Sequence, residues 1–195
     1  MRSLLGAQTI VRVDRLGPSK NVALGFRAFG LLLERPPDLV GRVCFLAFPV
    51  PSRETLEEYR SYAWEVWQAV EAVNTQFGRE GWKPIEVFYE DNRSQAIAGM
   101  SLADVLVINP VPDGMNLVAK EGSIVNERDA VLVLSRECGA HAQLGSAVLA
   151  IAPPGTWLHP FETGCYSGVV SASDKRMTSS ARSSLSSFRS LTVIR

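Results

Sequence analysis

The stretch Asp113-Gly114-Met115-Asn116-Leu117-Val118-Ala119-Lys120-Glu121 (DGMNLVAKE) directly follows an apolar run, residues 104–109 (DVLVIN), and two prolines. The apolar run has the composition of a strand that is buried on both faces of a parallel sheet. Pro110 and Pro112 end the strand, and Gly114 allows a tight turn into a helix that we expect to begin near Met115. A strand, a short loop and a helix N-terminus place free backbone N–H groups at the carboxyl edge of a sheet. Open α/β folds bind anionic ligands at this edge.

Glu121 gives this loop and helix a second feature of interest. We expect it about two turns into the helix, where its carboxylate can accept hydrogen bonds from two neighbouring hydroxyls, such as those of a ribose. A solvated loop followed by an ordinary surface glutamate fits the same residues. The pattern by itself leaves both interpretations open.

Apolar runs and helical stretches alternate along the rest of the chain. Strands are expected at residues 8–13, 42–50, 84–89, 104–109, 130–134 and 147–152. Helices are expected at residues 21–34, from an N-cap at Ser52 to Phe77, through 97–102, and from about Ala142. Roughly six strands alternating with helices, without an internal repeat, predict an α/β fold with a doubly wound parallel sheet.

Two cations flank the turn that follows the first expected strand. Arg15 and Lys20 lie at its carboxyl end, where both side chains can face a diphosphate. Arg presents a planar fork to phosphate oxygens, and Lys presents a point charge. The alternative is a loop with two solvent-exposed cations.

Composition excludes several classes of function. The 195 residues have a net charge of +0, so no basic surface predicts nucleic acid as a partner. The longest apolar runs are far too short to span a membrane. Cys44, Cys138 and Cys165 lack metal-ligand spacing and predict free thiols in a reducing cytoplasm. His141 and His159 are too few and too far apart to predict a metal site.

The signature DGMNLVAKE, together with residues 132–135 (LVLS) and the pair Gly139-Ala140, resembles that of the trehalose-6-phosphate synthase family of retaining glycosyltransferases (family 20). Residues 13–21 (VDRLGPSKN) resemble the loop in which that family holds the donor's phosphates with an Arg and a Lys five residues apart. Asn21 stands where well-known members have Gly. The resemblance covers about residues 10–153 and implies a Rossmann-like fold, that of the C-terminal, nucleotide-sugar-binding half of a GT-B glycosyltransferase.

The resemblance implies a donor site and part of an acceptor site. Arg15 and Lys20 are the expected catalytic residues, because they would neutralise the departing diphosphate. The expected donor-binding residues are Asp113, Gly114, Met115, Asn116, Leu117, Val118 and Glu121, with Asp113 facing sugar hydroxyls, backbone amides holding phosphate and Glu121 holding the ribose. Arg53 and Arg93 are expected on the acceptor side. No metal or other cofactor is implied, and the donor substrate is a nucleotide-sugar such as UDP-glucose or GDP-glucose.

The implied reaction is glycosyl transfer from a nucleotide-sugar to a sugar phosphate in cytoplasmic trehalose biosynthesis. The family's first half, with its His and Asp near the reacting carbon, has no counterpart here. We therefore expect this chain to need a separate N-terminal half, or to act as a homo-oligomer, and to bind donor without turnover by itself. An inactive fragment, a binding module without catalysis, and a transferase acting on a cyclitol phosphate are the alternatives. A dinucleotide-dependent oxidoreductase is disfavoured, because the first loop has only Gly17 where a pyrophosphate turn needs three glycines.

The organisation expected from these patterns is a nucleotide-sugar-binding domain at residues 1–156 and a serine-rich basic tail at 157–195. The family's pattern is lost at residues 152–155 (APPG). The composition of the tail predicts disorder. A frameshifted or truncated reading frame explains the same loss of pattern, and a genuine new linker is the alternative.

Overall fold

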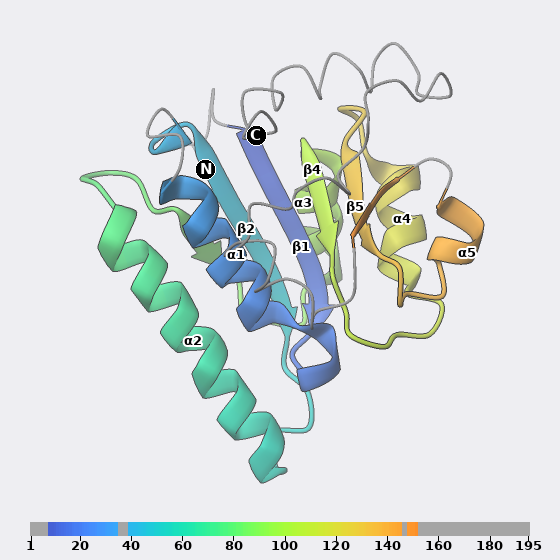
Figure 1. Ribbon diagram of the computed structural model, residues 1–195, viewed down its shortest axis with the longest axis horizontal. Coiled ribbons are helices and arrows are strands. Elements are labelled where there is room, and N and C mark those ends of the chain that lie inside the picture. Colours follow the sequence, from blue (N-terminus) through green and yellow to red (C-terminus); the bar gives the residue numbers. More distant parts are fainter. Residues whose placement is uncertain (1–7, 35–38, 146–147, 152–195) are drawn as a thin grey trace.

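A computed structural model describes residues 8–34, 39–145 and 148–151. It contains one six-stranded sheet in the order β3-β2-β1-β4-β5-β6, and every neighbouring pair is parallel (Figure 1). The strands are β1 (Gln8–Arg15), β2 (Val43–Val50), β3 (Ile85–Val87), β4 (Val105–Ile108), β5 (Val131–Ser135) and β6 (Leu149–Ile151). The expected α/β fold with a doubly wound parallel sheet is confirmed.

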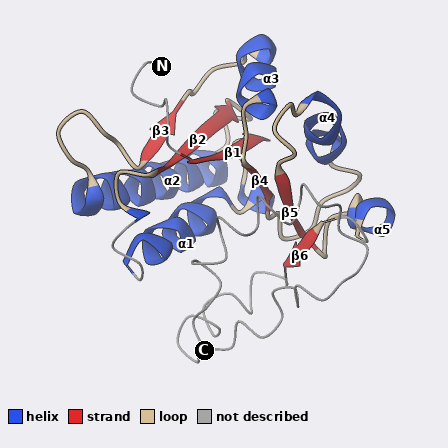
Figure 2. Ribbon diagram, turned by 90° about the horizontal axis from the view of Figure 1, so that it is seen from above, coloured by secondary structure: helices blue, strands red, loops and turns tan. Residues whose placement is uncertain are grey.

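Helices cover both faces of the sheet. The helices are α1 (Val22–Glu34), α2 (Glu57–Phe77), α3 (Arg93–Ser101), α4 (Leu117–Val125) and α5 (His141–Leu144), with a 3₁₀ turn, η2, at Pro18–Lys20. Figures 1 and 2 show α1 and α2 on one face and α3 and α4 on the other. No helix among the described residues is long and apolar enough to cross a membrane.

Alternate residues of the central strands supply two separate cores. Ile10 and Phe45 belong to the core under α1 and α2, whereas Val11 and Leu46 belong to the core under α3 and α4. Because both faces are covered, these strands are apolar at nearly every position, which is why they appear in the sequence as continuous runs. The ring of Phe26 packs edge-on against that of Phe45, with centroids 5.2 Å apart, and fixes α1 on its face.

One expected helix start is wrong, and another is displaced by two residues. Ser52 does not cap α2, which begins at Glu57 after Leu56, and residues 51–56 form a loop in which Arg53 has a φ of 46°. The helix expected near Met115 begins at Leu117. Asn116 has a φ of 49° and its side chain accepts a hydrogen bond from the Ala119 amide, so Asn116 is the N-cap and cannot be part of the helix.

Other expectations need smaller corrections or concern residues that the structure does not describe. Glu121 lies little more than one turn into α4, not two, because the helix starts later. Strand β1 continues to Arg15, which pairs in register with Val50 of β2. The predictions for residues 157–195 fall outside the described residues.

The strand order places a topological switch point between β1 and β4. From β1 the chain goes first to β2 and β3 on one side, and then crosses to β4, β5 and β6 on the other. The connection after β1 leads to one side of the sheet and the connection after β4 leads to the other, so the two loops at the carboxyl ends of these strands leave in opposite directions. Open α/β sheets bind ligands at such a switch point.

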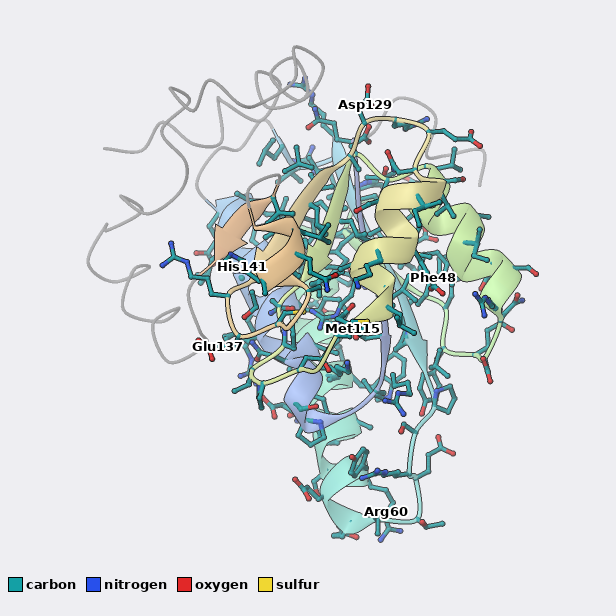
Figure 3. All side chains as sticks on the ribbon, turned by 90° about the vertical axis from the view of Figure 1, so that its right-hand side faces the viewer. Phe48, Arg60, Met115, Asp129, Glu137 and His141 are labelled. Carbon is teal, nitrogen blue, oxygen red and sulfur yellow. The ribbon has the colours of Figure 1, made fainter. Side chains whose placement is uncertain are left out.

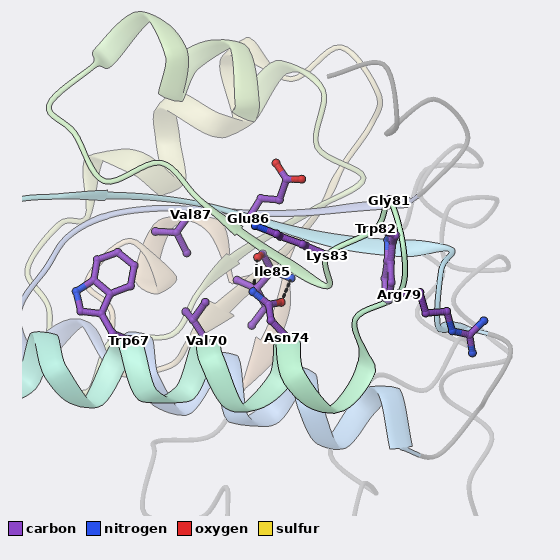
Figure 4. A pocket seen from close by; sticks show the side chains of 10 residues that line it. All are labelled: Trp67, Val70, Asn74, Arg79, Gly81, Trp82, Lys83, Ile85, Glu86 and Val87. Atoms are coloured by element: carbon purple, nitrogen blue, oxygen red, sulfur yellow. Dashed lines mark hydrogen bonds between the residues drawn. The ribbon is translucent and has the colours of Figure 1, made fainter.

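The side chain of Asn74 joins helix α2 to the edge strand β3 by hydrogen bonds. Figure 4 shows Asn74 reaching from α2 to Ile85. The Asn74 amide donates to the Ile85 carbonyl at 2.9 Å, and its oxygen accepts from the Ile85 amide at 2.8 Å. Asn74 therefore pairs with β3 as a further strand would.

We expect Asn74→Ala to lower the free energy of unfolding by about 1–3 kcal/mol, because it leaves two backbone groups of a buried residue without partners. Urea denaturation measures the change. Gln68→Ala is the matched control, since Gln68 lies on the same helix and is exposed. Equal stabilities for the two variants would contradict this role of Asn74.

Candidate functional site

Three loops meet at the carboxyl edge of the central strands. The loop after β4 is hydrogen-bonded to both neighbouring loops. The Val111 amide donates to the Ser19 carbonyl at 2.9 Å, and the Gly139 amide donates to the Gly114 carbonyl at 2.8 Å. In Figure 3, Met115 and Glu137 lie at the same end of the sheet, far from Asp129 at the opposite end. The loops after β1, β4 and β5 therefore form one continuous surface.

Lys20 and Asp113 form the ion pair at the centre of this surface. Lys20 Nζ lies 2.7 Å from Asp113 Oδ2, and the Asn116 amide donates to the same carboxylate oxygen at 2.7 Å. Partial burial opposes ionisation of Asp113, but the hydrogen bonds from Lys20 and Asn116 outweigh it and hold the pKa of Asp113 below its ordinary value. Asp113 is therefore a carboxylate at neutral pH. The structure brings together two residues that the sequence predicted for one site from segments 93 positions apart.

A pair of asparagines joins the same two loops. The Asn21 side chain donates to the Asn109 carbonyl at 3.1 Å, and the Asn109 side chain donates to the Asn21 carbonyl at 3.1 Å. Asn21 has a φ of 56°, a backbone conformation that Asn adopts more readily than most residues. The turn that the resemblance associates with a glycine is thus kept, and its asparagine side chain also braces the site.

Beneath these loops lie two charged residues that the sequence patterns did not indicate. Arg12 and Asp14 project from β1 towards α1, are almost fully buried, and form an ion pair at 3.0 Å. Burial raises the pKa of Asp14 above its ordinary value, although Arg12 and Lys20 nearby act in the opposite direction. Charged residues at alternate positions of an otherwise apolar strand were the signal that could have identified them.

Arg15 differs from Lys20 in its surroundings. It is the last residue of β1, its side chain is exposed, and it forms no ion pair with another described residue. Among the described residues, the guanidinium therefore has no anion to leave before it can bind a ligand. In the first turn of α4, Asn116 satisfies the Ala119 amide; the amides of Leu117 and Val118 have no partner within the helix.

The two arginines predicted for the acceptor side lie in different places. Arg93, at the start of α3, forms an ion pair at 3.1 Å with Glu121, which was predicted to bind the ribose. Arg53 instead lies over the ring of Tyr59, 5.6 Å from its centroid, and donates to the Tyr59 hydroxyl at 3.2 Å. The structure therefore joins Arg93 to the expected donor side, and the assignment of both arginines to the acceptor remains a prediction.

Two hollows lie on the half of the molecule that contains α2. One, of about 370 Å³, adjoins Arg53 and is lined by Leu16, Ser52, Glu54, Tyr59, Arg60, Ala63, Trp64, Trp67 and Tyr89. The other, of about 550 Å³, lies between α2 and β3 and contains none of the predicted site residues (Figure 4). The first hollow is the one that adjoins the predicted site, because Leu16 and Ser52 follow directly after β1 and β2 at the sheet's carboxyl edge.

Comparison of the sequence with known families and proteins agrees with the resemblance carried by the signature. The family model of glycosyltransferase family 20 matches residues 1–157. The alpha,alpha-trehalose-phosphate synthase (UDP-forming) of Schizosaccharomyces pombe is 35% identical over 150 residues, which are 76% of this chain and 29% of that protein. The chain thus spans less than a third of the length of that relative.

Solved structures share this fold and, like the sequence relatives, are matched over only part of their length. An alpha,alpha-trehalose-phosphate synthase (UDP-forming) from Burkholderia xenovorans, in complex with glucose-6-phosphate, superposes with a TM-score of 0.76 and 28% identity, over 97% of this chain and 42% of that one. An E. coli protein bound with UDP-2-fluoro glucose superposes with a TM-score of 0.75 and 26% identity, over 97% and 42%. From the family match, the sequence identity and the shared fold together, we conclude that the chain belongs to glycosyltransferase family 20.

Proposed function

We propose that this chain is the donor-binding half of a retaining glycosyltransferase of the trehalose-phosphate synthase type. It binds a nucleotide-sugar at the switch point, where the loops after β1 and β4 meet. Together with an acceptor-binding half, from a separate chain or a second copy, it transfers the glycosyl group to a sugar phosphate. UDP-glucose is the first donor to test, since relatives are named as UDP-forming.

One observation supports the proposal most directly: Lys20 and the DGMN loop meet at the topological switch point. The Lys20–Asp113 contact of 2.7 Å places a cation beside the N-terminus of α4. A helix N-terminus and a cation next to it both favour an anion. In this arrangement a diphosphate replaces Asp113 as the partner of Lys20 and also contacts Arg15, while the freed Asp113 carboxylate accepts hydrogen bonds from the donor sugar.

The chemistry follows from the charge that develops as the bond to the donor breaks. Negative charge accumulates on the departing diphosphate, and cations fixed in place stabilise it more than they stabilise the intact donor. Arg15 and Lys20 supply that charge in this proposal. Retention without an enzyme nucleophile, which the family resemblance implies, then requires the acceptor to be held close to the same face of the sugar.

The acceptor is proposed to lie on the Arg53 side. Arg53 adjoins a hollow of about 370 Å³ whose wall includes Trp64, an exposed aromatic residue on which a sugar ring can stack. Arg93, paired with Glu121, is better placed to orient that carboxylate on the ribose. We place this activity in the cytoplasm, a location consistent with the free thiols of Cys44 and Cys138.

Removal of either predicted phosphate-binding cation should weaken the binding of a nucleoside diphosphate. We expect Arg15→Ala and Lys20→Ala each to reduce binding by about 1–3 kcal/mol, the range of a charge-assisted hydrogen bond. Isothermal titration calorimetry with UDP measures the loss. Arg27→Ala is the matched control, because Arg27 pairs with Glu65 on the outer surface of α1 and α2. Equal affinities of all three variants would exclude this site.

Glu121→Gln should distinguish a ribose contact from a general electrostatic effect. If Glu121 accepts hydrogen bonds from ribose hydroxyls, the variant lowers the affinity for UDP by about threefold to tenfold. It leaves the affinity for inorganic pyrophosphate unchanged, because pyrophosphate has no ribose. Titration of both ligands into both proteins is the measurement. Glu71→Gln, at an exposed position of α2, is the control. The same change for UDP and pyrophosphate would contradict the assignment.

A further inference from the structure

The buried guanidinium of Arg12 lies directly beneath the proposed phosphate site. Arg12 is in the middle of β1, and its side chain is 2% exposed. It points into the layer between the sheet and α1, where Gly25 leaves room for it: a Cβ at Gly25 would lie 3.0 Å from Arg12 Nη1. The absence of a side chain at Gly25 allows a charged group to fit at a position that would otherwise be apolar.

The guanidinium contacts both loops that form the site. Nη2 donates to Asp14 Oδ2 at 3.0 Å and to the Lys20 carbonyl, and Nη1 donates to the side-chain oxygen of Asn109. Asn109 in turn is paired with Asn21. One side chain therefore connects the backbone of Lys20 with the residue that follows β4.

Stability of the fold does not account for this residue. The Nε atom of Arg12 is buried and has no hydrogen-bond partner among the described residues. A buried charge with an unsatisfied donor costs free energy, and apolar side chains often replace buried ion pairs without loss. Of the two neighbouring positions on the same face of β1, Ile10 is an ordinary core residue, and Asp14 is the ion-pair partner of Arg12.

The distribution of charge around Lys20 supplies a reason. Two carboxylates face its ammonium: Asp113 Oδ2 at 2.7 Å and Asp14 Oδ1 at 3.6 Å. If Lys20 were the counter-ion of both, it would be held in the protein and would bind an anionic ligand poorly. Arg12 supplies the second positive charge, so that Asp14 is balanced from within the core.

We propose that Arg12 is a positioning residue that acts as the buried counter-ion of Asp14 and thereby leaves the Lys20 ammonium available to a diphosphate. This inference rests on the proposed role of Lys20 in donor binding and adds a further residue to it. Arg12 itself touches neither the diphosphate nor the sugar. Its effect on binding is exerted through Asp14.

The test is a set of pyrophosphate titrations, all run at pH 8 so that every variant is compared under one condition. We expect Arg12→Met to weaken pyrophosphate binding by about tenfold, because Lys20 is then the only cation near Asp14 among the described residues. The double variant Arg12→Met/Asp14→Asn removes the charges as a pair and should return to within about threefold of the wild type. Arg12→Gln is neutral but keeps an amide for the same acceptors, and it should lose as much pyrophosphate affinity as Arg12→Met.

Three comparisons decide the outcome. If the wild type does not bind pyrophosphate, or Lys20→Ala binds as well as the wild type, the donor site itself is wrong. If Lys20→Ala weakens binding but Arg12→Met and Arg12→Gln do not, Arg12 has no such role. A double variant that stays as weak as Arg12→Met would show that Arg12 acts otherwise than through Asp14. Thermal unfolding by circular dichroism identifies any variant that does not fold, and Arg12→Gln then replaces Arg12→Met in the comparison.

Discussion

The arrangement of the site depends on hydrogen bonds that join the loops after β1 and β4 across the switch point of the sheet. Each loop follows a strand in a different part of the sequence, and a loop by itself has no fixed position relative to the other. The reciprocal amide pair of Asn21 and Asn109, with both contacts at 3.1 Å, ties the two backbones together. With the backbones tied, Lys20 meets Asp113 at 2.7 Å. A site of this kind is organised before a ligand arrives, which lowers the entropic cost of binding.

Charge within the site is balanced in two layers. The inner layer is the buried pair of Arg12 and Asp14, and the outer layer is Lys20 with Asp113 near the surface. Arg15 lies at the rim without a partner among the described residues. Such an order allows an anionic ligand to exchange with one carboxylate at the surface while the charges in the core remain compensated. It also keeps Asp113 ionised, because the donors around it favour its charged form.

The limited extent of the match shapes the functional interpretation. The alignment with the Burkholderia xenovorans structure covers 97% of this chain and 42% of that one. In the proposed function this chain supplies the donor-side residues, whereas its acceptor side consists of Arg53 and one adjacent hollow. Glycosyl transfer requires both substrates to be positioned together. For that reason a complementary half is an integral part of the proposed activity.

The sequence alone determined the α/β class, the parallel sheet and the family, because continuous apolar runs and a nine-residue signature are local properties of the chain. It also predicted Lys20 and Asp113 for one site, through resemblance. Only the tertiary structure placed Arg93 on Glu121 rather than beside Arg53, since that contact depends on how α3 and α4 pack. The helix starts at Leu117 and Glu57 depended on backbone angles at Asn116 and in the loop around Arg53, which no local pattern indicated. The roles of Arg12 and Asp14 could not be predicted for a related reason: the effect of a charge within a strand depends on the groups that surround it in space.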